Sequence, residues 1–204
     1  MTQTDAATAT WTTGGGAVAW VFRVLLIAGA AFMVYSWLQP WWIGDVAVIK
    51  GEDNLVLHPW GVDAAAQVRA NIDESVFQMP FPSVFAGFMW VYLAVCMLAI
   101  LVSLFINRRI SIGPINVSAA MLLILFVGLS YMAVVGLALG IGILKASAAG
   151  ANFIGKSNVL EPGSGAKLKM VSYLVTGYWL ALGAGGALTL LGLIRPLFFR
   201  KPKV

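Results

Sequence analysis

The residues that could do chemistry in this 204-residue chain are concentrated in one polar stretch, residues 37–82, which lies between two long apolar runs. The stretch contains the single histidine, His58, and six of the eight carboxylates: Asp45, Glu52, Asp53, Asp63, Asp73 and Glu74. Imidazole and carboxylate groups ligate divalent metal ions, so the sharpest hypothesis is a metal site built from His58 with Asp53, Asp63 or another of these acids. One histidine among scattered acids matches no recognised ligand spacing. We therefore favour a solvated acidic face and predict no bound metal or other cofactor.

The rest of the chain offers little for catalysis. The four apolar runs contain no Asp, Glu or His, although proton relays and ion pathways normally need ionisable groups inside the membrane. The single cysteine, Cys96, lies within an apolar run. No phosphate-cradling glycine motif and no credible Ser-His-Asp set is present. We expect no catalytic residue in this chain; the enzymatic alternative is that His58 contributes to a metal site completed by another subunit.

The elements that must position these residues are membrane helices. The chain is 60% hydrophobic and 10% charged, with a mean hydropathy of +0.90, which excludes an ordinary soluble domain. We predict one all-α integral membrane domain over residues 1–204, a four-helix bundle whose spans cover residues 17–38, 84–106, 117–144 and 171–194. The third span is longer than the roughly 20 residues that a bilayer core requires, so it either tilts or projects beyond the membrane. Two outer loops, residues 39–83 and 145–170, join the spans.

The first outer loop has its own periodicities. Residues 45–50 and 55–58 each carry apolar β-branched residues and lie on either side of a turn, which predicts a short β-hairpin. Asp63 then caps a predicted amphipathic surface helix that runs to about Val76. The second outer loop is rich in glycine, and we expect it to be a loop with at most one short strand.

Tryptophans flank these predicted elements. Trp41, Trp42 and Trp60 have two interpretations. They either anchor the loop at the membrane interface, which we favour, or bind a partner as the apolar part of a docking surface.

Small residues recur at four-residue spacing in the last two spans, which brings them onto one helix face and allows a neighbouring helix to approach closely. The predicted helix-packing residues are Gly136, Gly140, Gly177, Ala181 and Gly185. We favour packing within the bundle, with an oligomer contact as the alternative.

Basic residues indicate the orientation. Seven lie near span ends on one side: Arg23, Arg108, Arg109, Arg195, Arg200, Lys201 and Lys203. Six lie on the other side, mostly within the longer loops, where the positive-inside rule is weaker. We therefore place both termini in the cytoplasm. If the source is bacterial, we place the protein in the inner membrane. The basic residues at the cytoplasmic ends then lie near anionic lipid, which explains the net charge of +5. Nothing in the sequence indicates nucleic-acid binding.

The layout as a whole resembles the claudin and peripheral-myelin tetraspan family. The features shared are four spans, an outer hairpin after Pro40-Trp41-Trp42, a surface helix before the second span, a long third span and a shorter second loop. The resemblance implies a structural tetraspan protein. The family's Gly-Leu-Trp element with two loop cysteines is missing, since the nearest residues are Pro59-Trp60-Gly61 and no loop cysteine exists.

The functional hypothesis that follows is a non-catalytic accessory subunit of a larger membrane protein complex of respiratory, photosynthetic or membrane oxygenase type. Its partners would be other integral membrane subunits and lipid, and its outer loop would dock on a neighbour. Three alternatives remain: a small homo-oligomeric channel or transporter, a claudin-like structural protein, and the shared metal site at His58.

Overall fold

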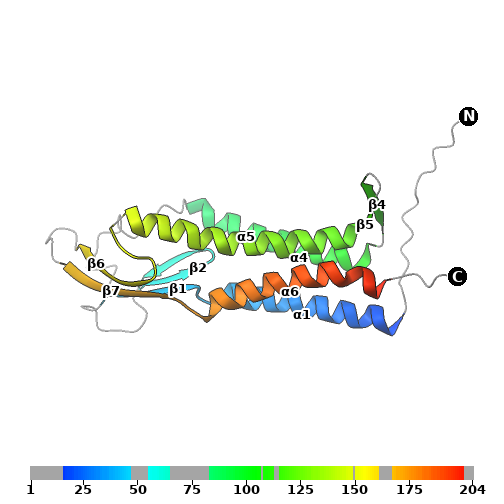
Figure 1. The fold of residues 1–204 in the computed structure, drawn as a ribbon, viewed down its shortest axis with the longest axis horizontal. Coiled ribbons are helices and arrows are strands. Elements are labelled where there is room, and N and C mark those ends of the chain that lie inside the picture. Colours follow the sequence, from blue (N-terminus) through cyan, green and yellow to red (C-terminus); the bar gives the residue numbers. More distant parts are fainter. Residues whose placement is uncertain are drawn as a thin grey trace, which may run out of the picture.

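The computed structural model describes residues 16–46, 55–64, 83–106, 108–112, 115–148, 150–160 and 167–199. Two parts follow one another along the long axis (Figure 1): a bundle of long helices, and a curved sheet at one end of that bundle.

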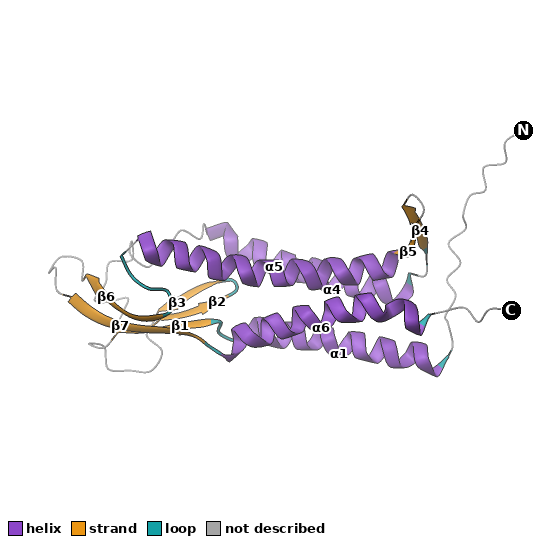
Figure 2. Ribbon diagram, viewed as in Figure 1, coloured by secondary structure: helices purple, strands orange, loops and turns teal. Residues whose placement is uncertain are grey.

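The bundle consists of α1 (Ala17–Leu38), α4 (Ser83–Phe105), α5 (Ala119–Ala148) and α6 (Thr176–Phe198). Each helix is long and apolar enough to cross a membrane, so the chain is an integral membrane protein with a helical bundle. Figure 2 shows these helices lying roughly along one axis, with α6 packed against both α1 and α5, and α4 packed against α5.

The predicted spans agree with these helices to different degrees. The first span coincides with α1 at both ends, and α4 differs from the second span by one residue at each end. The third helix continues to Ala148, four residues beyond the predicted end, and α6 begins at Thr176 rather than at residue 171. The start of the fourth span was wrong because residues 171–174 belong to a strand.

The sheet has five strands: β1 (Trp42–Val46), β2 (Leu55–His58), β3 (Gly61–Ala64), β6 (Gly155–Leu160) and β7 (Lys167–Leu174). Their order is β3-β2-β1-β7-β6, and each neighbouring pair is antiparallel. The central pairing joins β1 to β7, in a register that runs from Trp42 opposite Leu174 to Val46 opposite Met170. The two outer segments of the chain therefore form one sheet.

This sheet bears differently on three expectations for the first loop. The predicted hairpin is present as β1 and β2, but β1 begins at Trp42, and residues 47–54 lie outside the described part. Asp63 does not cap a helix, because Pro59 and Trp60 form a turn that returns the chain as β3, where Asp63 is opposite Val56. The remainder of the predicted surface helix, from residue 65 onward, falls outside the described residues.

The second outer segment also differs from expectation. It contributes two strands rather than at most one, and β7 is the longest strand of the sheet. An all-α description consequently holds for the membrane part of the chain but not for its outer part.

A second, smaller hairpin lies at the opposite end of the bundle (Figure 1). It is formed by β4 (Arg109–Ile112) and β5 (Ile115–Ser118), with Arg109 opposite Ser118. Residues 113–114, between these strands, lie outside the described residues.

The longest helix connects the bundle to the sheet. The 30 residues of α5 span about 45 Å at 1.5 Å per residue, against a hydrocarbon core of about 30 Å. Its far end extends alongside the sheet (Figure 1), where Gly142 lies against the ring of Phe153. The sheet is thus covered on one side by a helix that continues from the membrane part.

Candidate functional site

The one titratable pair that the prediction singled out is brought together by the β2–β3 hairpin. His58 ends β2 opposite Gly61, and its Nε2 atom lies 3.7 Å from Oδ2 of Asp63. The His58 ring stacks on Trp60, with 4.7 Å between ring centroids and 10° between the planes. The side chain of His58 is 16% exposed and that of Asp63 is 67% exposed, so the pair lies at the boundary between the sheet and solvent.

The surroundings of His58 favour its neutral form. Burial lowers the pKa of His58 below its usual value of 6.5. The nearby Asp63 carboxylate and the backbone of Gln39 oppose this shift only in part. A neutral imidazole could ligate a metal ion or accept a proton.

The metal hypothesis needs more ligands than this pair supplies. Zinc sites use three or four protein ligands. Among the described residues no three His, Cys, Asp or Glu side chains lie close enough to hold one ion. Asp53, the third candidate, lies outside the described residues.

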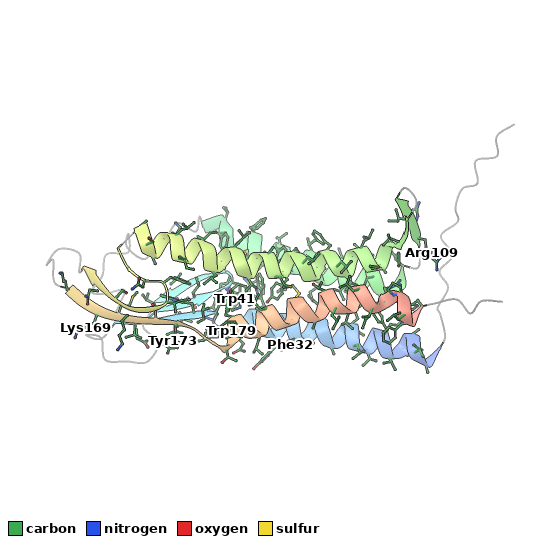
Figure 3. All side chains as sticks on the ribbon, in the orientation of Figure 1. Phe32, Trp41, Arg109, Lys169, Tyr173 and Trp179 are labelled. Atoms are coloured by element: carbon green, nitrogen blue, oxygen red, sulfur yellow. The ribbon has the colours of Figure 1, made fainter. Side chains whose placement is uncertain are left out.

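A cluster of aromatic rings occupies the junction between the sheet and the helices. Figure 3 shows Trp41 at this junction, and its side chain is 2% exposed. The Trp41 ring packs edge-on against Trp37 at 6.2 Å and against Tyr131 at 6.4 Å, and Trp37 stacks on Tyr131 at 6.1 Å. Each such aromatic pair contributes about 0.5–1.5 kcal/mol beyond its buried area.

Hydrogen bonds fix the position of these rings. Trp41 Nε1 donates to the carbonyl of Ser36 at 3.1 Å, and the hydroxyls of Ser36 and Tyr131 lie 3.0 Å apart. The Trp41 backbone belongs to the sheet, because its N–H donates to Leu57 at 2.8 Å and its carbonyl accepts from Val175 at 3.1 Å. Trp41 therefore connects α1, α5 and the sheet.

Trp42 attaches the second outer segment in the same way. Its ring stacks on Phe153 with 5.0 Å between centroids and 6° between planes, and its Nε1 donates to the Phe153 carbonyl at 2.6 Å. Trp60 continues the aromatic cluster on the other side, where it stacks on Trp90 of α4 at 5.2 Å. The outer sheet is thus fixed to the bundle at several points.

The predicted partner-binding tryptophans occupy interior positions. Trp41 is 2% exposed, Trp42 is 8% exposed, and Trp60 is partly buried between His58 and Trp90. Little of the first two rings is accessible to another chain, so any docking surface must use other side chains. Their role in binding a partner stays a prediction.

The predicted helix-packing residues fall into two groups. Ala181 is fully buried, Gly185 lies against Met132 of α5, and Gly177 lies against Gln39 and Pro40 at the end of α1. Gly136 and Gly140 differ, because no described atom outside the neighbouring backbone of α5 lies within 4 Å of the position that a methyl group would occupy on either. We expected these two glycines to pack inside the bundle, but they face away from the other described helices.

Two hydrogen bonds between helices of the bundle were not predicted from the sequence. Ser36 and Tyr131 form one, and Tyr92 and Ser130 form the other, again with 3.0 Å between hydroxyls. A serine within an apolar run usually satisfies its hydroxyl on its own helix, as Ser103 does on Ile100. The sequence shows that tyrosine and serine occur within the apolar runs, but it does not show which serine bonds to which tyrosine.

The fold and its junction define a class of protein: an integral membrane protein whose four-helix bundle carries a five-stranded sheet at one end. The junction holds elements together, and His58 and Asp63 form an acid–imidazole pair at its edge. No protein-family model, curated protein or solved structure matches the chain.

Proposed function

We propose that the chain is a non-catalytic subunit that packs with and stabilises a larger membrane protein complex of respiratory, photosynthetic or membrane oxygenase type. The observation that carries the proposal is the uncovered face of α5 at Gly136 and Gly140. Glycines four residues apart on a membrane helix let a neighbouring backbone approach closely, and this contact is the usual use of such a pair.

The contrast with another glycine of the same helix supports this interpretation. Gly128 lies against the backbone of α6, so its missing side chain serves a contact inside the chain. Gly136 and Gly140 lie two and three turns further along, beside the exposed Leu137 and Leu144, and serve no contact of this kind. A helix of a partner subunit is the occupant that we propose for this face.

The outer sheet offers a second exposed surface for a partner. Strand β7 presents Val171 and Tyr173, which are 42% and 41% exposed. Lys156 of the neighbouring strand β6 is opposite Val171. Lys169 is exposed on the same face, and Figure 3 shows it further from the bundle than Tyr173. Apolar and aromatic side chains rimmed by charge are typical of protein interfaces. Because aromatic contacts fix the sheet to the helices, this surface keeps a constant position relative to the open face of α5.

The orientation that accompanies this proposal places the β4–β5 end in the cytoplasm and the five-stranded sheet outside. Arg108 and Arg109 are exposed at the former end, close to the ends of α4 and α5, where the positive-inside rule carries most weight. In a bacterial cell this would be the inner membrane.

A claudin-like structural tetraspan protein is the second candidate. It is favoured by the hairpin that follows Pro40 directly and by α5, the longest helix of the bundle. This candidate also needs no catalytic residue, and it differs from the first in requiring copies of this chain, rather than other subunits, as partners.

A substitution at the open glycines tests the proposal. The double variant Gly136→Leu/Gly140→Leu adds side chains where the chain itself has empty space, so the isolated fold should be retained. We expect the variant to lose its partner on gentle detergent extraction, as measured by size-exclusion chromatography of the native extract. Gly87→Leu in α4 is the matched control, because that position is also open and exposed. Retention of the complex in the double variant would contradict the proposal.

A further inference from the structure

A buried arginine lies at the end of the bundle opposite to the sheet. Arg195, in the last turn of α6, is 5% exposed and is the one buried charged side chain among the described residues. Its NH1 group donates to the hydroxyl of Ser118 at 2.5 Å, and NH2 makes a long contact of 3.5 Å with the Ile106 carbonyl. The guanidinium lies over the ring of Phe199 at 4.5 Å.

These contacts do not neutralise its charge. Within the described part of the chain, Nε of Arg195 has no hydrogen-bond partner, and both acceptors of NH1 and NH2 are uncharged. The described carboxylates are Asp45 on β1 and Asp63 on β3, at the other end of the molecule (Figure 2). An arginine is always ionised, and a buried charge is normally paired with an opposite one. The carbonyl ends of α4 and α6 supply only partial negative charge.

A second arginine, Arg109, lies in the hairpin that also contains Ser118. Arg109 is exposed and stands opposite Ser118 in the β4–β5 hairpin. Side chains opposite one another in an antiparallel pair share a face, with Cβ atoms about 4.5–5.5 Å apart. The Ser118 hydroxyl accepts from Arg195, so the side chain of Arg109 leaves the hairpin on the same face as the serine that Arg195 contacts. The hairpin therefore brings a second basic residue close to the buried Arg195, and no acid among the described residues lies at this end of the bundle.

We propose that this end of the bundle binds a phosphate-bearing anion between Arg109 and Arg195. The planar guanidinium matches the oxygens of a phosphate, and Ser118 holds Arg195 in position for it. The exposed Phe105 and Leu197, both 63% exposed, lie at this end of α4 and α6, where an acyl chain would run along the bundle. These apolar neighbours favour the headgroup of an anionic phospholipid over a free phosphate. Binding at this site does not require a protein partner.

Lipid titration of the full chain tests the proposal. The protein is purified in an uncharged detergent, stripped of lipid, and titrated with dihexanoyl phosphatidylglycerol while tryptophan fluorescence reports the midpoint of thermal unfolding. We expect a saturable rise of the midpoint, because a ligand that binds the folded state stabilises it. Dihexanoylglycerol, which lacks the phosphate, should give no rise.

Matched variants locate the site. Arg109→Gln should weaken the apparent affinity about tenfold or more, since a lost charged hydrogen bond costs that much. Arg108→Gln removes the same charge from the neighbouring residue and should change the affinity less than about threefold, as a surface charge does. Arg195→Lys keeps the charge but loses the planar fork, and should abolish the rise if the variant folds.

The outcomes separate the sources of the phosphate. A rise with the phospholipid alone supports a lipid headgroup, whereas a saturable rise with inorganic phosphate, lost in Arg109→Gln, supports the same site with a soluble anion. Equal weakening by Arg108→Gln and Arg109→Gln would overturn the proposal in favour of a diffuse basic surface, and so would the absence of any saturable rise.

Discussion

Two glycines of α5 should respond in opposite ways to the same substitution. A methyl group on Gly128 would lie 2.6 Å from the backbone nitrogen of Thr189 and 2.9 Å from the carbonyl oxygen of Gly185. Both atoms belong to the backbone of α6, so the helices must move apart to admit it. A methyl group on Gly136 meets no atom within 4 Å.

The expected magnitudes follow from these distances. Overpacking a close contact costs about 1–3 kcal/mol, so Gly128→Ala should lower the free energy of unfolding by this amount. Gly136→Ala should leave it unchanged or raise it by up to about 1 kcal/mol, the advantage of alanine over glycine in a helix. The two variants should therefore differ by about 1–4 kcal/mol although the chemical change is identical.

The assay is reversible unfolding in mixed detergent micelles, followed by tryptophan fluorescence, with both variants compared with the unmodified chain. A Gly128→Ala variant as stable as the Gly136→Ala variant would refute the description of the α5–α6 contact. It would also contradict the difference in environment between Gly128, which lies against α6, and Gly136, which faces open space.

Two further predictions concern the outer sheet. Because burial lowers the pKa of folded His58 below 6.5, the unfolded state binds the proton more readily; the stability from His58 is present above pH 6.5 and is lost as the pH falls below it. The midpoint of thermal unfolding should therefore decline below pH 6.5, and His58→Gln should remove this part of the decline, whereas an unchanged profile would contradict it. Trp41→Ala should lower the free energy of unfolding by about 3–5 kcal/mol, with Trp41→Phe intermediate, and hydrogen exchange in β1 should rise; an unchanged exchange rate would show that Trp41 does not hold the sheet.

The membrane part of this fold could be predicted from the sequence because the spans are long apolar runs without acids. α1 and α4 were located to within one residue at each end. The boundary between β7 and α6 could not be located in the same way, because residues 171–174 are as apolar as the helix that follows. The alternation of Lys167 and Lys169 with apolar residues was the available sign of a strand.

The candidate site was less predictable, since its key properties depend on which side of a helix a residue faces. Gly128 and Gly136 are indistinguishable in the sequence, yet only the first contacts a neighbouring helix of the chain. Arg195 belongs to a basic terminal segment by composition, but the β4–β5 hairpin and the end of α6 bury it against Ser118. Such differences arise from tertiary contacts, which local patterns do not encode.

The central claim is that this chain functions as one subunit among several. Its most direct test is native mass spectrometry of the protein extracted from its own membrane with a mild detergent. The account predicts a stable assembly that contains this chain together with other integral membrane subunits in fixed proportion. A folded, monodisperse monomer, or an assembly of this chain alone, would contradict it.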